Sequence, residues 1–133
     1  MKLLLDTCAL LWTMADASRL SDTARMAIEN IDNEVMISMV SLQEIAIKSA
    51  LGKLSLSGIA IADIPVKFRR RGISLLDLSA TDCERYVSLP VLENHRDPFD
   101  RFLVCQALTR DLTLVSAGSK MAGYRKDGLS VLW

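Results

Sequence analysis

Near its start the sequence reads Leu3-Leu4-Leu5-Asp6, a short apolar run that ends at an acid. An apolar run of this length, with no alternating polar residues, is typical of a strand buried on both faces. Further short apolar runs follow along the chain, and the stretches between them carry the spacing and end signals of helices. This alternation predicts an α/β fold, a three-layer α/β/α sandwich with a mostly parallel central sheet.

Local signals place the other elements. Strands are expected at residues 35–38, 73–76, 112–115 and 130–133, and a loop at 90–96. Helices are expected from residue 9 onward and at about 21–31, 41–51, 59–71, 79–90 and 97–109. Ser21 and Asp97 suit the start of a helix, whereas Gly52 and Gly72 suit its end. No repeat or long linker divides the chain, so residues 1–133 are expected to form one domain.

The composition is that of a globular protein without strong net charge. Half of the 133 residues are hydrophobic and 24% are charged, which suits a chain with one core. Sixteen basic residues balance sixteen acidic ones. No long-range field therefore attracts a polyanion, and any contact with nucleic acid must use a local patch.

The cysteines and the N-terminal stretch indicate the cellular compartment of the protein. Cys8, Cys83 and Cys105 cannot all pair, and none has the Cys-x-x-Cys spacing of a zinc or redox site. Asp6 interrupts the first apolar run and no cleavage site follows, which argues against a signal peptide. No other segment approaches the length of a membrane span. We therefore expect a cytoplasmic protein with reduced thiols and no membrane contact.

Four acids fall where ligands gather in folds of this class. Asp6 ends the first strand, Glu44 lies early in the helix after the second strand, and Asp97 and Asp100 begin the last apolar helix. Strand ends and helix starts meet at the carboxyl edge of a parallel sheet, so these side chains are expected to converge. Crowded carboxylates repel unless a cation sits among them, and oxygen-only ligands favour Mg²⁺ or Mn²⁺. Such a site suits phosphodiester hydrolysis.

The same acids also fit structural roles in helix capping. Asp6 can cap the first helix, and Asp97 can cap the last one, with Pro98 in its first turn. The segment from Ser41 to Glu44 has the form of a capping box, and Glu44 can pair with Lys48 one turn later. These roles do not exclude a metal site, because helix starts lie on the active edge of the sheet.

With these residues in view, the sequence resembles the PIN-domain family, in particular its VapC-like toxins. The similar stretches are Leu3-Leu4-Leu5-Asp6-Thr7, Ser41-Leu42-Gln43-Glu44-Ile45, His95-Arg96-Asp97-Pro98-Phe99-Asp100-Arg101 and the ending Val131-Leu132-Trp133. The resemblance implies a PIN-like fold and Mg²⁺- or Mn²⁺-dependent endonucleolytic cleavage of RNA. It implies Asp6, Glu44 and Asp100 as the main catalytic metal ligands, Asp97 as a further acid and Thr7 as an accessory residue. It also implies a homodimer and a small antitoxin partner.

One position departs from the family pattern. Family members commonly carry a Thr-x-Asp step after the fourth strand, where this chain has Ser116 and Gly118. Ser116 can hydrogen-bond a carboxylate or a water as an accessory residue, but it supplies no charge. A catalytically weak or silent binding module is therefore an alternative. A Mg²⁺-dependent phosphoacceptor domain is a further alternative. In such domains an acidic pair follows the first strand, whereas here Thr7 follows Asp6.

Three other residues lie beside the acids. His95 is the only histidine, and a single histidine on a loop is more often a structural hydrogen-bonding group than a base. Arg96 and Arg101 are candidates for contact with RNA phosphates, because guanidinium groups match phosphate geometry. Arg101 can instead pair with Asp97, four residues earlier.

Overall fold

Five short strands form one parallel sheet in the computed structural model, which describes all 133 residues. The strands are β1 (Lys2–Leu5), β2 (Glu34–Ser38), β3 (Ser74–Leu76), β4 (Thr113–Val115) and β5 (Ser130–Leu132). Their order across the sheet is β3-β2-β1-β4-β5, and every neighbouring pair is parallel. All five predicted strands are confirmed, and none of their ends shifts by more than one residue.

Helices connect the strands. The α-helices are α1 (Thr7–Ala15), α2 (Asp22–Glu29), α3 (Met39–Ala50), α4 (Ile64–Arg69), α5 (Ala80–Ser88) and α6 (Pro98–Arg110). Three further segments form 3₁₀ helices, η1 (Ala17–Arg19), η2 (Ile61–Asp63) and η3 (Ser119–Asp127). None of the helices has the length and apolar character that a membrane span requires.

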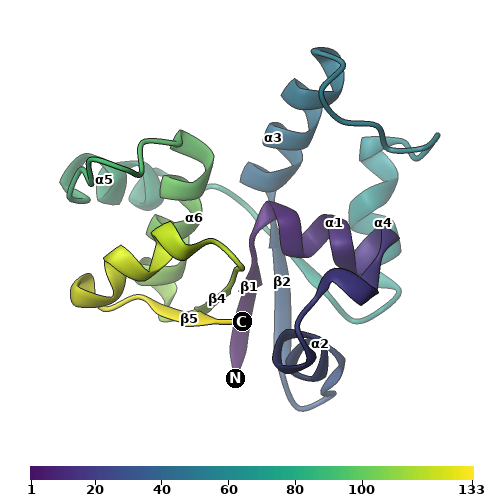
Figure 1. Cartoon of the computed structure of the whole chain (residues 1–133), viewed down its shortest axis with the longest axis horizontal. Coiled ribbons are helices and arrows are strands. Elements are labelled where there is room, and N and C mark those ends of the chain that lie inside the picture. The colour runs from purple at the N-terminus through teal and green to yellow at the C-terminus, as the bar shows by residue number, and fades with distance from the viewer.

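The sheet is covered on both faces. Leu3 and Leu5 of β1 point to one core, which α1, α2 and α4 complete, while Leu4 points to a second core under α6 and η3. Figure 1 shows α1, α2 and α4 on one side of the sheet and α5 and α6 on the other. The three-layer α/β/α prediction is confirmed, and period-two alternation along the strands is its physical cause.

The start of α3 differs from the prediction. Its N-cap is Ser38, whose hydroxyl accepts the Val40 N–H at 3.0 Å, so the helix begins before Ser41. The predicted capping box from Ser41 to Glu44 is therefore wrong. The reason is that β2 passes into α3 without a loop, and Ser38 is both the last strand residue and the cap.

Side-chain hydrogen bonds join α6, the helix that carries Asp100, to β2 and α5. Ser38 Oγ donates a 2.5 Å hydrogen bond to Gln106 Oε1, which joins α6 to the end of β2. Arg110 forms a bidentate pair with the buried carboxylate of Asp82 in α5, at 2.5 and 3.0 Å. Burial alone would raise the pKa of Asp82, but hydrogen bonds from Arg110 and Ser79 outweigh it and lower that pKa. The α6 helix is therefore anchored to both β2 and α5.

Candidate active site

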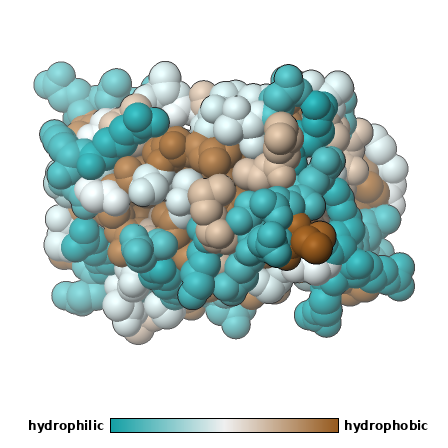
Figure 2. All heavy atoms as spheres, turned by 90° about the horizontal axis from the view of Figure 1, so that it is seen from below, coloured by the Kyte–Doolittle hydropathy of each residue, from teal (hydrophilic) through white to brown (hydrophobic).

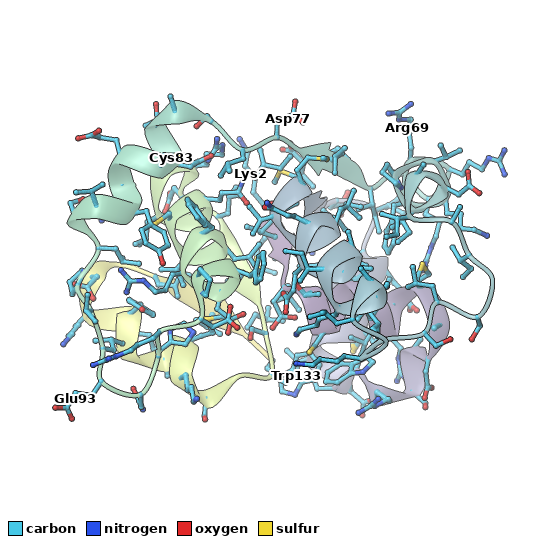
Figure 3. All side chains as sticks on the ribbon, turned by 90° about the horizontal axis from the view of Figure 1, so that it is seen from above. Lys2, Arg69, Asp77, Cys83, Glu93 and Trp133 are labelled. Carbon is cyan, nitrogen blue, oxygen red and sulfur yellow. The ribbon has the colours of Figure 1, made fainter.

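The central strands create a crevice at the carboxyl edge of the sheet. From β1 the chain continues to β2 and β3 on one side, and β4 and β5 lie on the other. Helices therefore leave the ends of β1 and β4 toward opposite faces, and ligand sites of open α/β sheets lie at such switch points. Figure 3 looks onto this edge and shows side-chain oxygens gathered between α3 and α6. Asp6 follows β1 here, and Ser116 follows β4.

A pocket of about 340 Å³ opens at this switch point. It brings together Asp6 and Asp100, two of the predicted site acids, with the predicted accessory residue Ser116. Its other lining residues are Cys8, Trp12, His95, Ala117, Gly118, Ser119, Lys120 and Met121. The topology thus places acids from distant parts of the sequence in one hollow, as the strand-end argument predicts.

Asp6 is both a helix cap and a buried acid. Its Oδ1 accepts the Ala9 N–H at 2.7 Å, which confirms the predicted cap of α1. Only 7% of the residue is exposed, and no basic side chain forms an ion pair with it. Burial raises the pKa of Asp6 to about 6. The Ser116 hydroxyl and the Ala9 N–H lower that pKa in part, while the charges of Asp100 and Glu44 raise it.

Glu44 projects from α3 toward the first turn of α1. The Thr7 hydroxyl donates a 2.6 Å hydrogen bond to Glu44 Oε1, and Lys48 Nζ pairs with Oε2 at 2.5 Å. The predicted pairing of Glu44 with Lys48 is confirmed. Thr7 also contacts Ser41 Oγ at 3.1 Å, so the predicted accessory residue Thr7 lies between α1 and α3. The Glu44 carboxylate is buried yet already has partners.

Asp97 and Asp100 occupy the start of α6 with different surroundings. Asp97 is exposed, and its Oδ1 accepts the N–H groups of Phe99 and Asp100 at 2.9 and 3.0 Å, which confirms its predicted cap role. Asp100 is more enclosed, and its Oδ2 lies 3.2 Å from His95 Nε2. Burial raises the pKa of Asp100, the hydrogen bond from His95 lowers it, and the charge of Asp97 raises it.

His95 belongs to a buried chain of hydrogen bonds. It is 2% exposed, and its Nδ1 lies 3.1 Å from the Tyr124 hydroxyl. Arg101 donates to the same hydroxyl oxygen at 3.1 Å, so the hydroxyl proton of Tyr124 is directed to Nδ1. In this arrangement Nε2 carries the imidazole proton and donates it to Asp100. His95 is thus the structural hydrogen-bonding group that its sequence position favoured.

Arg101 does not face the solvent, contrary to the prediction of a phosphate contact. It is 4% exposed, and its guanidinium donates to the carbonyl oxygens of Pro90 and Leu89 at 2.8 and 3.1 Å. It forms no ion pair with Asp97 either, so both sequence interpretations of Arg101 are wrong. The cause is the packing of the guanidinium against the Tyr86 ring, 4.8 Å from its centroid. Arg96 is exposed and remains a candidate for contact with RNA.

The acids do not form a finished metal cage as they stand. No group of three or more His, Cys, Asp or Glu side chains is arranged to hold a metal ion. Glu44 turns to Thr7 and Lys48, and Asp100 turns to His95. The donor chemistry nevertheless fits a hard cation, because the buried Asp6 carboxylate has no cationic partner and the acids near it, Asp100 and Glu44, offer oxygen ligands. The residues fit a divalent cation by chemistry, and binding it requires side-chain rotation.

The segment after β4 contributes hydroxyl and backbone groups in place of an acid. Ser116 is buried, and its Oγ accepts the Gly118 N–H at 3.0 Å. Sequence reasoning did not predict η3, which follows this segment, nor the part that Tyr124 and Lys120 of η3 play around the pocket. The stretch has no helical periodicity and its N-cap, Gly118, has no side chain to cap it, so only Gly128 at its end gives a local signal.

The fold and the pocket define an α/β protein with buried acids at the switch point of a parallel sheet. A model of the PIN-domain family matches residues 3–127, and the chain therefore belongs to that family. The predicted family is thus confirmed. No functionally curated protein matches the sequence.

Two solved structures share the fold. VapBC2 from Rickettsia felis, crystallised with a DNA fragment from its promoter, matches with a TM-score of 0.67 and 19% identity. That match covers 99% of this chain and 98% of the other. VapBC-1 from nontypeable Haemophilus influenzae matches with a TM-score of 0.58 and 18% identity, over 99% and 97% of the two chains. At these identities the likeness establishes the fold.

Proposed function

We propose that this protein is an endoribonuclease that depends on Mg²⁺ or Mn²⁺ and acts as the toxin of a toxin–antitoxin pair. The observation that carries the proposal is the state of Asp6. Its carboxylate is buried with no cationic partner, beside Asp100 and Glu44, and its pKa rises to about 6. Keeping three ionised acids together at neutral pH is costly, and a bound divalent cation offsets that cost.

In this proposal the four acids have different roles. Asp6, Glu44 and Asp100 hold the cation, and Asp97 adds negative charge from the exposed start of α6. When bound, Mg²⁺ or Mn²⁺ activates a water molecule for attack on a phosphodiester and neutralises charge that grows on the leaving oxygen. Thr7 holds Glu44, and Ser116 faces Asp6, so both hydroxyls orient carboxylates. The hydrogen bonds that anchor α6 to β2 and α5 hold Asp100 at the pocket.

Membership of the PIN family supports nuclease activity, since PIN domains are generally nucleases. The likeness in fold to two VapBC proteins supports the toxin–antitoxin assignment and a small antitoxin as partner. An apolar groove of about 250 Å³ beside the pocket offers a place for an antitoxin segment. Its apolar lining comprises Leu11, Trp12, Met14, Ala15, Leu54, Leu56 and Ile59. Co-purification with the product of an adjacent short open reading frame tests this partner.

We also propose that the protein is a homodimer in the cytoplasm. The α3 helix exposes Met39 and Ile47, with Leu51 at its end, on a face that a second copy can cover. The three unpaired cysteines suit a reducing compartment. Light scattering after size exclusion measures the dimer, and Ile47→Asp is expected to yield monomers. A monomeric wild-type protein at micromolar concentration would contradict the proposed dimer.

A silent binding module is the second candidate, because Gly118 lacks the usual acid and the side chains form no metal cage as they stand. Cleavage of single-stranded RNA by the purified protein, with Mg²⁺, Mn²⁺ or EDTA, separates the candidates. We expect cleavage with metal, and its loss in Asp6→Asn and Asp100→Asn while circular dichroism stays unchanged. Equal cleavage by wild type and both variants would refute the site, and no cleavage with any metal would favour the silent module.

A further inference from the structure

We propose that the two tryptophans of this chain, Trp12 and Trp133, form a stacking surface for an unpaired nucleotide of the RNA substrate beside the acidic pocket. The inference rests on the proposed ribonuclease function and assigns part of its substrate site. It starts from the position of the two rings. Trp12 lies in α1, whose cap is Asp6, and it lines the pocket that holds Asp6 and Asp100.

The two rings contact each other although their positions in the sequence are 121 apart. Their centroids are 5.5 Å apart with an interplanar angle of 53°. The Ser116 N–H donates to the Leu132 carbonyl at 3.1 Å, which sets Trp133 beside the segment that walls the pocket. Figure 3 shows Trp133 toward the bottom of the view, between the half that holds α6 and the half that holds α3. Of its surface, 37% is exposed.

A second hollow extends from the pocket toward Trp133. It has a volume of about 490 Å³, and it shares the wall of residues 116–119 with the acidic pocket. Trp133, Thr23 and Arg125 line its other side. Both hollows fall in the size range of small-ligand sites, roughly 300–1,000 Å³. A strand whose scissile phosphate lies at the acids therefore has room to place a neighbouring nucleotide at the tryptophans.

Three cations lie at the rings or in the adjoining hollows, although the chain as a whole is neutral. The Arg19 guanidinium carbon lies 4.7 Å from the Trp12 ring centroid, so Arg19 covers one face of Trp12 and the exposed ring of Trp133 is the main surface for a base. Lys120 lines the acidic pocket and Arg125 lines the second hollow, and all three cations are exposed. A neutral protein that binds a polyanion needs such a local patch, and sites for single strands combine cations for phosphates with aromatic rings for bases.

The surroundings of Trp133 favour a nucleotide over an apolar protein segment. The hollow at Trp133 has a mixed lining, in which six of eleven residues are polar or glycine, Ser116, Ser119 and Arg125 among them, whereas seven of the eleven residues of the apolar groove are hydrophobic. The apolar groove lies on another side of Trp12, around Leu54 and Leu56. Bases stack on aromatic faces with little dependence on sequence, so the surface would position a strand without selecting one base.

The chain offers a direct probe, because Trp12 and Trp133 are its only tryptophans. Intrinsic fluorescence is measured in an Asp100→Asn variant with Mg²⁺, so that the RNA is bound and cleavage is prevented. A short single-stranded RNA is expected to quench the emission, while inorganic polyphosphate leaves it nearly unchanged. Quenching by polyphosphate to the same extent would show contact with charge alone and overturn the stacking proposal.

Substitutions test the ring itself through the anisotropy of a labelled oligonucleotide in the same background. Trp133→Leu is expected to weaken RNA binding about tenfold, whereas Trp133→Phe, which keeps an aromatic face, retains most of the affinity. Lys120→Gln is expected to weaken binding and to lower the slope of affinity against salt by nearly one. Ile31→Ser is the control, because Ile31 is 97% exposed and belongs to the segment between α2 and β2. This segment lies at the end of the sheet opposite the pocket (Figure 1), the side from which Figure 2 views the molecule.

The outcomes separate this inference from the ribonuclease proposal. Cleavage of RNA by the wild type, together with unchanged RNA affinity in Trp133→Leu, would overturn the stacking surface and leave the ribonuclease intact. Quenching by an antitoxin peptide but not by RNA would assign the rings to the protein partner and also overturn it. RNA-specific quenching that Trp133→Leu weakens would support it, whether or not the wild type cleaves.

Discussion

The Thr7 hydroxyl donates a 2.6 Å hydrogen bond to Glu44 Oε1, so the residue after Asp6 holds an acid that lies 37 positions later. The bond joins the first turn of α1 to α3 at the carboxyl edge of the sheet. Burial of Glu44 is tolerable because Thr7 and Lys48 each satisfy one of its oxygens. Thr7 therefore determines where one proposed metal ligand points.

Replacement of Thr7 tests this positioning. Thr7→Val removes the hydroxyl and keeps the volume, and we expect Mn²⁺ affinity to fall severalfold as Glu44 loses its orientation. Thr7→Ser keeps a donor and is expected to retain most of the affinity. Binding of Mn²⁺ is measured by electron paramagnetic resonance, with thermal unfolding as the check on folding. Equal affinities for Val and Ser variants that both remain folded would contradict the positioning role.

Asp6 makes stability depend on pH in the absence of metal. Its carboxyl binds a proton more tightly in the folded than in the unfolded chain, because burial raises the pKa from 3.8 to about 6. The stabilisation from this proton is complete below pH 3.8 and is lost as the pH rises through 6. A pKa difference of this size changes the free energy of unfolding by roughly 3 kcal/mol at most.

Asp6→Asn should therefore stabilise the metal-free protein at pH 7.5 and change its stability little at pH 4. The amide still caps α1, so the capping bond to the Ala9 N–H is kept. Urea unfolding in EDTA at both pH values measures the difference between variant and wild type. Adding Mn²⁺ should raise the stability of the wild type and have much less effect on the variant. A variant less stable than wild type at pH 7.5 would be inconsistent with a costly buried charge.

The sequence alone predicts those parts of the site that depend on where a residue lies relative to the end of a strand or the start of a helix. Asp6 ends a strand and Asp97 begins a helix, so the acidic edge and both caps could be predicted without knowledge of distant contacts. The start of α3 could not be predicted correctly, because Ser41 and Glu44 satisfy the sequence rules of a capping box. Ser38 is the cap instead, at the end of a buried strand where its hydroxyl also bonds to Gln106, 68 residues away.

Long-range partners explain the other differences. Arg101 has the spacing of an ion pair with Asp97, but its guanidinium meets the carbonyls of Leu89 and Pro90 and the hydroxyl of Tyr124. Tyr124 lies in η3, a segment without helical periodicity, so neither its contact with His95 nor its burial is visible in a local pattern. Such contacts depend on how η3 packs against α6.

His95 is expected to act as a positioning residue for Asp100 through its Nε2–H. His95→Gln can bridge the Tyr124 hydroxyl and Asp100 with its amide oxygen and nitrogen, whereas His95→Leu can do neither. We predict that Gln retains Mn²⁺ affinity within a few fold and that Leu lowers it by about an order of magnitude. Titration of Mn²⁺ into each folded variant provides the measurement.

A double-mutant comparison is the control for His95. In an Asp100→Asn background, where the carboxylate is absent, His95→Leu should cause little further loss of metal affinity. If the losses of metal affinity from His95→Leu and Asp100→Asn instead add in full, His95 acts on the fold or on another ligand rather than on Asp100. Thermal unfolding of all four proteins shows whether the comparison is made between folded states.

Gly118 is the position at which an acid can be restored. Its φ is −71°, which an L-residue adopts without strain, and an added Cβ would lie 3.2 Å from Ser116 Oγ and 3.7 Å from Met121 Cγ. Gly118 also lines the pocket with Asp6 and Asp100, so a carboxylate there adds an oxygen ligand and a negative charge. We predict that Gly118→Asp raises Mn²⁺ affinity about tenfold and lowers metal-free stability at pH 7.5, because another acid joins those already present.

Gly118→Asn is the matched control, since it requires the same small shift of Ser116 without adding charge. Calorimetric Mn²⁺ titration and unfolding in EDTA compare the three proteins. Equal Mn²⁺ affinity for the Asp and Asn variants would mean that a carboxylate at position 118 does not reach the metal.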